Sequence, residues 1–214
     1  MEKDEIFRKF EYHILNDRKP SNFFNEIFHE EWFKETYPFK LLSVLAKVEQ
    51  SPKHHPEGNV WRHTMLVLDY AAKKKDQSGD PRVFMWAALL HDLGKAETTR
   101  NRNGKITAYD HDKIGEKLAR DFLKEFSNDI VFINSVSKLV RWHMQILFVV
   151  NKLPFADINQ MLKDTSIEEV ALLGLCDRLG RGKLDVDKVE EEYENINEFI
   201  DTCQSFKAEM QYLN

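Results

Sequence analysis

In the stretch Ala87-Ala88-Leu89-Leu90-His91-Asp92-Leu93-Gly94-Lys95, a histidine and an aspartate directly follow a strongly apolar run. The run predicts a buried helix. A carboxylate at the end of such a helix is costly to desolvate unless a cation pairs with it, and a divalent metal ion is an economical partner. The sequence therefore predicts that His91 and Asp92 bind metal.

Further candidate ligands lie on segments that have the pattern of helices or helix starts. They are His63, His111, His143 and Asp177. Imidazole and carboxylate together suit Mn²⁺, Fe²⁺, Co²⁺, Ni²⁺ or Zn²⁺, and Mg²⁺ is a further candidate, so the metal's identity stays open. Asp110 is expected to cap the helix that begins at His111.

These ligands divide into one site or two. The first set, His63, His91, Asp92 and Asp177, leaves coordination positions for water and a phosphate oxygen, unlike a closed structural site. His111 and His143 would hold a second ion, with the Asp92 carboxylate as the bridge between the two. We expect one or two divalent ions per chain.

Composition places the chain among globular proteins. The 214 residues are 42% hydrophobic and 12% aromatic, which suffices for a packed core. The net charge of −5 argues against long-range attraction to nucleic acid, although local basic groups could hold a phosphate. No apolar run approaches the ~20 residues of a membrane span, and the charged N-terminus has no signal core, so a cytoplasmic protein that does not contact membrane is expected.

Apolar residues recur at helical spacing almost throughout, which predicts an all-α bundle. The pattern breaks at residues 98–109, where Asn103-Gly104 favours a type I′ hairpin or tight loop between two candidate ligands. Basic residues such as Arg100 would make this loop the positive mouth of a site, although a merely soluble turn is an equal alternative. We expect residues 1–38 to form a helical extension packed on the core, and residues 39–214 to form one domain with a long closing helix.

Four segments carry a resemblance to a known family. They are His55-Pro56-Glu57-Gly58-Asn59-Val60-Trp61-Arg62-His63-Thr64, His91-Asp92-Leu93-Gly94-Lys95, Gly104-Lys105-Ile106-Thr107-Ala108-Tyr109-Asp110-His111 and Cys176-Asp177-Arg178-Leu179-Gly180-Arg181. The chain resembles the HD superfamily of metal-dependent phosphohydrolases, and within it the HD domain of bacterial CCA-adding tRNA nucleotidyltransferases. The similarity runs from about residue 41 to residue 181.

The resemblance implies an HD-type helical bundle and a hydrolytic activity. In the tRNA enzymes the HD domain is linked to phosphatase, 2′-nucleotidase and 2′,3′-cyclic phosphodiesterase activity. No Gly-rich strand-turn with paired aspartates precedes the HD-like region here, so we do not expect nucleotide addition. We expect a metal-activated hydroxide to cleave a phosphomonoester or cyclic phosphodiester of a nucleotide or RNA terminus.

Catalytic and substrate-binding roles follow from charge. Asp92 and Lys95 are the expected catalytic residues, because Lys95 lies one helical turn beyond His91 and can neutralise phosphoryl oxygens. Lys95, Arg100, Arg178 and Arg181 are the expected substrate-binding residues, although both of the later arginines could instead complement a helix dipole. Two alternatives are a catalytically inactive metal-containing module that binds nucleotide or RNA, and an accessory subunit of a separate nucleotidyltransferase.

Overall fold

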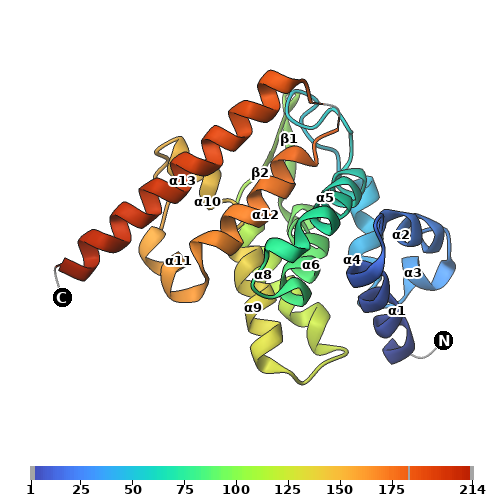
Figure 1. Ribbon diagram of the computed structural model, residues 1–214. Coiled ribbons are helices and arrows are strands. Elements are labelled where there is room, and N and C mark those ends of the chain that lie inside the picture. Colours follow the sequence, from blue (N-terminus) through green and yellow to red (C-terminus); the bar gives the residue numbers. More distant parts are fainter. Residues whose placement is uncertain (1–2, 183, 213–214) are drawn as a thin grey trace.

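The computed structural model describes residues 3–182 and 184–212, and helices account for most of them (Figure 1). The helices are α1 (Lys3–Asn16), α2 (Ser21–Ile27), α3 (Glu31–Glu35), α4 (Lys40–Ser43), α5 (Val60–Lys74), α6 (Pro81–Leu90), α7 (Lys95–Thr98), α8 (His111–Lys124), α9 (Ile130–Trp142), α10 (Gln145–Val150), α11 (Ile158–Asp164), α12 (Ile167–Leu179) and α13 (Val186–Tyr212), with the 3₁₀ helices η1 (Val44–Lys47) and η2 (Lys75–Gln77). The strands are β1 (Thr99–Arg102) and β2 (Lys105–Ala108). The expectation of an all-α bundle with a small hairpin is confirmed.

Helix α6 is the centre of the bundle. Asp80 caps it by accepting a hydrogen bond from the Val83 N–H at 3.1 Å, and Pro81 supplies the fixed φ of a first helical residue. All residues from Val83 to Leu90 are buried, as expected of a helix that is apolar all round. Helices α1, α5, α9 and α12 pack around it, so the turn that follows α6 lies inside the molecule.

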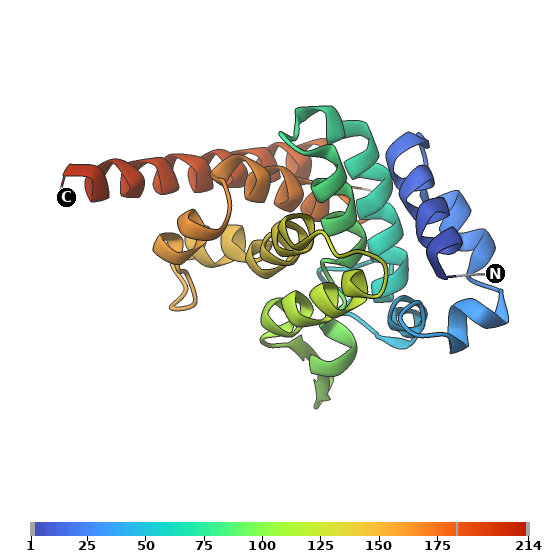
Figure 2. The same cartoon turned by 90° about the horizontal axis from the view of Figure 1, so that it is seen from below.

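The N-terminal helices lie against α5 and α6 (Figure 2). Aromatic side chains contribute to this packing. Phe7 stacks on Trp86 with ring centroids 4.7 Å apart, and Phe10 contacts Phe39 at 5.3 Å. One hydrophobic core therefore runs through residues on both sides of residue 38. The division into an extension and a domain at that residue stays a prediction.

Strands β1 and β2 pair antiparallel with Arg102 opposite Lys105. Asn103 and Gly104 have φ values of 52° and 80°, the left-handed conformations that a type I′ turn requires. Asp110 occupies the position before α8 but does not cap it, because its own φ is 59° and its carboxylate pairs with Lys113 at 2.7 Å. The expected capping role was therefore wrong.

Gly94 fixes the turn after α6 against α8. A Cβ atom at this position would lie 2.0 Å from the carbonyl oxygen of His111 and 2.7 Å from the amide nitrogen of Gly115. The φ of Gly94 is −64°, so close approach rather than an unusual conformation requires glycine. This contact sets how near His111 lies to the turn that carries Asp92.

Helix α13 closes the bundle against α10, α11 and α12, and its C-terminal end projects beyond the rest of the molecule (Figure 1). Its buried residues include Ile196, Phe199 and Cys203. In the part of the chain that the structure describes, no helix is both long and apolar enough to cross a membrane.

Candidate metal centre

Five segments of the bundle bring the six expected ligands together. His63 lies on α5, His91 and Asp92 in the turn after α6, His111 at the start of α8, His143 just after α9, and Asp177 on α12. Each of the six residues is buried, with at most 8% of its surface exposed. Residues that are 114 positions apart in the chain therefore meet in one polar cluster inside an apolar core.

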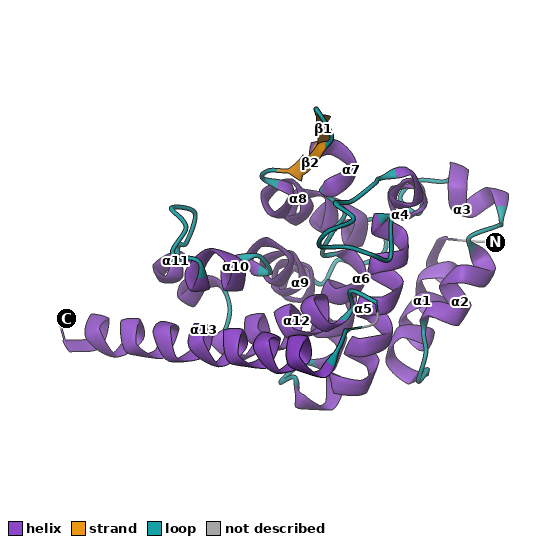
Figure 3. Ribbon diagram, turned by 90° about the horizontal axis from the view of Figure 1, so that it is seen from above, coloured by secondary structure: helices purple, strands orange, loops and turns teal. Residues whose placement is uncertain are grey.

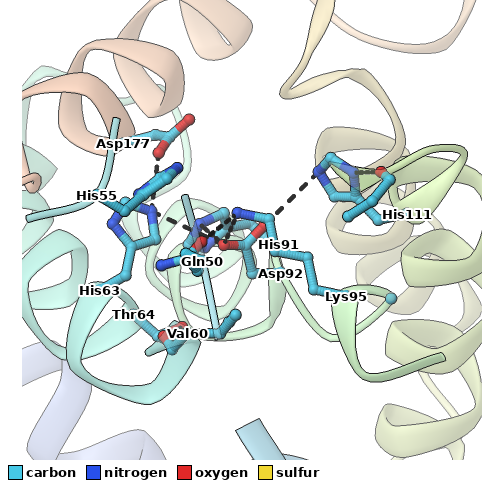
Figure 4. A network of polar contacts seen from close by, with 12 residues as sticks. Gln50, His55, Val60, His63, Thr64, His91, Asp92, Lys95, His111 and Asp177 are labelled. Carbon is cyan, nitrogen blue, oxygen red and sulfur yellow. Dashed lines mark hydrogen bonds and ion pairs between the residues drawn. The ribbon is translucent and has the colours of Figure 1, made fainter. Parts of the chain in front are cut away.

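Asp92 is the centre of this cluster, with imidazole nitrogens on both sides (Figure 4). Its Oδ2 lies 3.3 Å from His91 Nε2 and 3.8 Å from His63 Nε2. Its Oδ1 lies 3.7 Å from His111 Nε2 and 3.8 Å from His143 Nε2. Each carboxylate oxygen therefore faces its own pair of histidines, which is the arrangement of two adjacent ligand sets that share one carboxylate.

Backbone carbonyls fix the orientation of three of the imidazoles. The Nδ1–H groups of His91, His111 and His143 donate to carbonyl oxygens three residues earlier, at 2.9, 2.6 and 2.6 Å. These carbonyls belong to helix ends or to the end of β2, where they accept no hydrogen bond from a helical N–H group. Each Nε2 therefore carries a lone pair directed at Asp92, as a metal ligand requires.

Glu57 orients the remaining imidazole. Its Oε1 accepts from His63 Nδ1 at 2.8 Å and from His55 Nδ1 at 2.9 Å, and its side chain is only 4% exposed. Burial alone would raise the pKa of this carboxyl, but the two histidine hydrogen bonds hold the pKa of Glu57 at about 2. His63 Nε2 thus faces Asp177 Oδ1, 2.9 Å away.

Several buried atoms of the cluster lack the partner that their chemistry requires. His91 Nε2 has no hydrogen-bond partner, and His111 Nε2 lies 3.2 Å from His143 Nε2 although both Nδ1 atoms already carry the proton. Two lone pairs at that distance repel unless a proton or a cation lies between them. The donor set, four imidazole nitrogens and two carboxylates, therefore fits divalent metal ions.

The charge states also suit cation binding. Burial opposes ionisation, but His91 and Lys95 hold the pKa of Asp92 well below its usual value, and Arg181 and His63 do the same for the pKa of Asp177. Burial, with His111 and His91 nearby, lowers the pKa of His143 to about 4. At neutral pH both carboxylates are charged and His143 is neutral, which is the form that coordinates a metal.

Lys95 and Arg181 lie beside the cluster as the sequence led us to expect. Lys95 Nζ is 2.7 Å from Asp92 Oδ2 and donates to Gln50 Oε1 at 2.8 Å. Arg181 has a guanidinium nitrogen 3.6 Å from Asp177 Oδ2. Both side chains line the cavity that opens above the cluster.

The other two expected substrate-binding arginines lie elsewhere. Arg178 is 7% exposed and forms a buried ion pair with Glu192 of α13, so it joins two helices and does not reach the cavity. Arg100 is exposed on β1, donates to the carbonyls of Glu97 and Thr99, and does not line the cavity. Neither residue lines the cavity, and a substrate-binding role for the two stays a prediction.

The cavity above the cluster has a volume of about 920 Å³. It lies between the hairpin and the segment that joins α10 to α11, and both project to the same side of the molecule (Figure 3). Its polar floor includes Asp92, Lys95 and His143. A space of this size holds a small organic ligand.

Sequence reasoning missed two residues that shape this site. Glu57 lies in a loop without periodicity, and the only signal for it was its place six residues before His63. Arg141 lines the cavity, pairs with Asp112 and stacks over the Trp142 ring at 4.3 Å. Nothing in the sequence distinguished Arg141 from the other basic residues on helix surfaces.

Comparison with known proteins supports the resemblance seen in the sequence. The Multifunctional CCA protein of Halorhodospira halophila is 30% identical over 147 residues, which are 66% of this chain and 34% of that protein. Its counterpart from Methylococcus capsulatus is 32% identical over 129 residues, or 60% and 28% of the two chains. The counterpart from Aromatoleum aromaticum is 49% identical over 80 residues, or 30% and 19%.

The chain thus spans about a third or less of the length of these relatives. The family description "HD domain" matches residues 60–182, a segment that contains His63, Asp177 and the four candidate ligands between them. This segment is more than half of the 214 residues, and the chain therefore belongs to the HD domain family.

Proposed function

We propose that this protein is a metal-dependent phosphohydrolase that cleaves a phosphomonoester or a cyclic phosphodiester of a nucleotide or an RNA terminus. One observation carries the proposal: each oxygen of the buried Asp92 carboxylate faces its own pair of imidazole nitrogens at the floor of an open cavity. Membership of the HD domain family supports the same reaction class, because members of that superfamily are generally metal-dependent hydrolases.

Two ligand sets would hold the cations. His63, His91, Asp92 and Asp177 form the first set, and Asp92, His111 and His143 form the second. Divalent cations in these sets would polarise a phosphoryl oxygen and lower the pKa of bound water toward ~7, which supplies a nucleophile at neutral pH. Glu57 accepts a hydrogen bond from the Nδ1–H group of His63, which leaves the Nε2 atom of the same ring free for coordination.

The cationic side chains beside the ligands bind and orient the phosphoryl group. Lys95 reaches the floor of the cavity from the first turn after Asp92, and Gln50 holds its ammonium group in place. Arg181 approaches from the end of α12, and Arg141 from α9. Fixed positive charges beside the reacting group stabilise the charge that spreads over phosphoryl oxygens in the transition state.

The size of the cavity and the relatives support a nucleotide as the source of the phosphate. About 920 Å³ holds a nucleoside as well as a phosphoryl group. The relatives are called Multifunctional CCA proteins, a name that refers to a nucleotide sequence.

A hydrolysis panel with metal analysis tests the proposal. The substrates are 2′-AMP, 3′-AMP, 5′-AMP, 2′,3′-cyclic AMP and bis-p-nitrophenyl phosphate, each assayed with the wild type and with Asp92→Ala. Asp164→Ala is the matched control, because it removes a largely buried carboxylate that pairs with Lys138 and Trp142 away from the cluster.

We expect the wild type and Asp164→Ala to contain metal and to cleave one class of ester, and Asp92→Ala to do neither. A wild-type protein that binds no divalent metal and cleaves none of these esters would refute the proposal. Bound metal and bound nucleotide without turnover would instead identify the inactive binding module.

A further inference from the structure

The cavity above the candidate metal centre has a second wall whose chemistry the hydrolytic reaction does not explain. Its floor is polar and charged, but the side formed by α10 and the following segment is apolar. That side consists of Met144, Leu147, Phe148, Leu153, Pro154 and Phe155, which we call the apolar wall. One cavity therefore places a continuous apolar surface beside a polar floor that carries the candidate metal ligands together with Lys95 and Arg181.

The apolar wall presents aromatic rings to solvent. Phe155 is 58% exposed and Leu147 is 39% exposed, although most large apolar side chains of the described chain are buried. The rings of Phe148 and Phe155 lie with centroids 5.6 Å apart at an angle of 58°. Solvent-exposed rings beside a polar site are a common feature of ligand pockets.

A buried glutamine holds the segment that carries Phe155. Gln145 has no exposed surface, and its Oε1 accepts a hydrogen bond from the Asp157 N–H at 2.9 Å while its Nε2 donates to the Phe155 carbonyl at 3.5 Å. The Leu153 N–H donates to the Phe148 carbonyl at 2.8 Å. These bonds hold the backbone of the segment, so Phe155 projects from a fixed part of the chain at the edge of the cavity.

Hydrogen bonds within the segment already involve the polar side chains of Gln145 and Asp157, which could otherwise contact a ligand. The Asp157 carboxylate accepts from the Gln160 N–H at 3.0 Å as the cap of α11, and both polar ends of the Gln145 side chain are bonded within the segment. The six residues of the apolar wall carry no polar side-chain atom other than a methionine sulfur. This wall offers stacking surface but no side-chain donor or acceptor for the edge of a base.

We propose that the apolar wall binds the nucleobase of the substrate by stacking on Phe155, and that it does so without distinguishing among the four bases. The inference rests on the proposed function for the position of the phosphate at the polar floor. An apolar aromatic face joined to a floor of candidate metal ligands, Lys95 and Arg181 matches a nucleotide, which has a flat base at one end and an anionic group at the other. Stacking is tolerant of base identity because every base has a π-face.

Binding measurements with hydrolysis-resistant probes separate this inference from catalysis. The probes are adenosine 5′-O-thiophosphate and inorganic thiophosphate, which share one anionic group and differ by the nucleoside. Both are titrated calorimetrically into the full wild-type chain, Phe155→Ala and Tyr12→Ala. Tyr12 is the matched control because it is an aromatic residue on α1 that is 62% exposed and lies outside the cavity.

We expect Phe155→Ala to bind the nucleoside thiophosphate about 5- to 150-fold more weakly than the wild type, the range measured for loss of one stacking contact. Its affinity for inorganic thiophosphate should stay within about twofold of the wild type, and Tyr12→Ala should bind both probes as the wild type does. The guanosine, cytidine and uridine 5′-O-thiophosphates should bind within about tenfold of the adenosine compound.

Three results would overturn the inference. One is a wild type that binds the nucleoside probe no more tightly than inorganic thiophosphate. Another is a Phe155→Ala variant that weakens both probes equally or neither. The third is a spread of more than about a hundredfold among the four bases, which would require hydrogen-bond readout of the base edge. If the hydrolysis panel failed while Phe155-dependent binding held, only the proposed reaction would be lost.

Discussion

Gly94→Ala tests whether the turn after α6 is pressed directly against α8. The new Cβ would lie 2.0 Å from His111 O, 2.7 Å from Gly115 N and 2.8 Å from His111 C. All three atoms belong to the backbone, so no flexible side chain can move aside. Since the φ of Gly94 is −64° and its ψ is −20°, alanine adopts its conformation without strain, and the effect of the substitution is purely steric.

The size of the effect follows from the overlap. A carbon and an oxygen atom in contact lie roughly 3.4 Å apart, so α8 must retreat by more than about 1 Å. Overpacking of a tight core costs about 1–3 kcal/mol, and backbone contacts place this substitution at the upper end. For a protein of this length, ~3 kcal/mol lowers the melting temperature by about 6–12 °C. In the wild type, His111 Nε2 lies 3.7 Å from Asp92 Oδ1. The same retreat of α8 would increase this distance, so the second ligand set should no longer bind a cation.

Thermal unfolding and metal analysis measure the two consequences. Gly79→Ala is the control, because its Cβ would meet only Glu169 Oε1 at an ordinary 3.6 Å. We expect Gly79→Ala to behave as the wild type does in both assays. A Gly94→Ala protein that melts within about 2 °C of the wild type, with its metal content unchanged, would refute the contact between the turn and α8.

Four further substitutions test separate parts of the site. Lys95→Ala should keep the wild-type metal content but lower kcat about 100-fold, because one preorganised cation is lost; a kcat within threefold of the wild type would contradict its catalytic role. The pKa of His143 is about 4 in the folded chain and 6.5 in the unfolded chain. The contribution of neutral His143 to the stability of the metal-free protein is therefore complete above pH 6.5 and is lost as the pH falls toward 4. Urea unfolding in EDTA should therefore show that the stability advantage of the wild type over His143→Gln shrinks by about 2 kcal/mol between pH 7 and pH 5. The raised pKa of His63 has the opposite effect on stability, but His63 is present in both proteins and its effect cancels. An advantage that does not change with pH would count against a buried neutral His143. Arg178→Met should lose about 3–5 kcal/mol of stability by leaving Glu192 unpaired, with turnover per folded molecule unchanged. Arg181→Met should instead lower turnover and leave stability nearly unchanged. Equal effects of the two substitutions on turnover would indicate that Arg178 also binds substrate.

The fold was predictable because its signals are local. An apolar run marked α6 as buried, and Asn103-Gly104 marked the hairpin. The ligand residues could also be proposed from sequence, since each lies at a helix end or on a helix next to apolar neighbours. The structure then brings these candidates together around Asp92.

The directions of single side chains were not predictable, because tertiary contacts decide them. Arg178 and Arg181 are three residues apart at the end of α12, yet Glu192 of α13 draws Arg178 away from the cavity. The conformation of Asp110 depends on how β2 joins α8, and its positive φ directs the carboxylate to Lys113. Glu57 gained a role only because its loop folds back onto His63.

The central claim is that Asp92 joins two ligand sets. Its most direct test is the number of metal ions per chain, measured by elemental analysis of the wild type, His111→Gln and Asp92→Ala purified under one set of conditions. The arrangement of the ligands predicts two ions in the wild type, one in His111→Gln and none in Asp92→Ala, with the helical content of all three proteins alike. An Asp92→Ala protein that retains the wild-type number of ions would contradict a shared carboxylate and, with it, the whole account of the site.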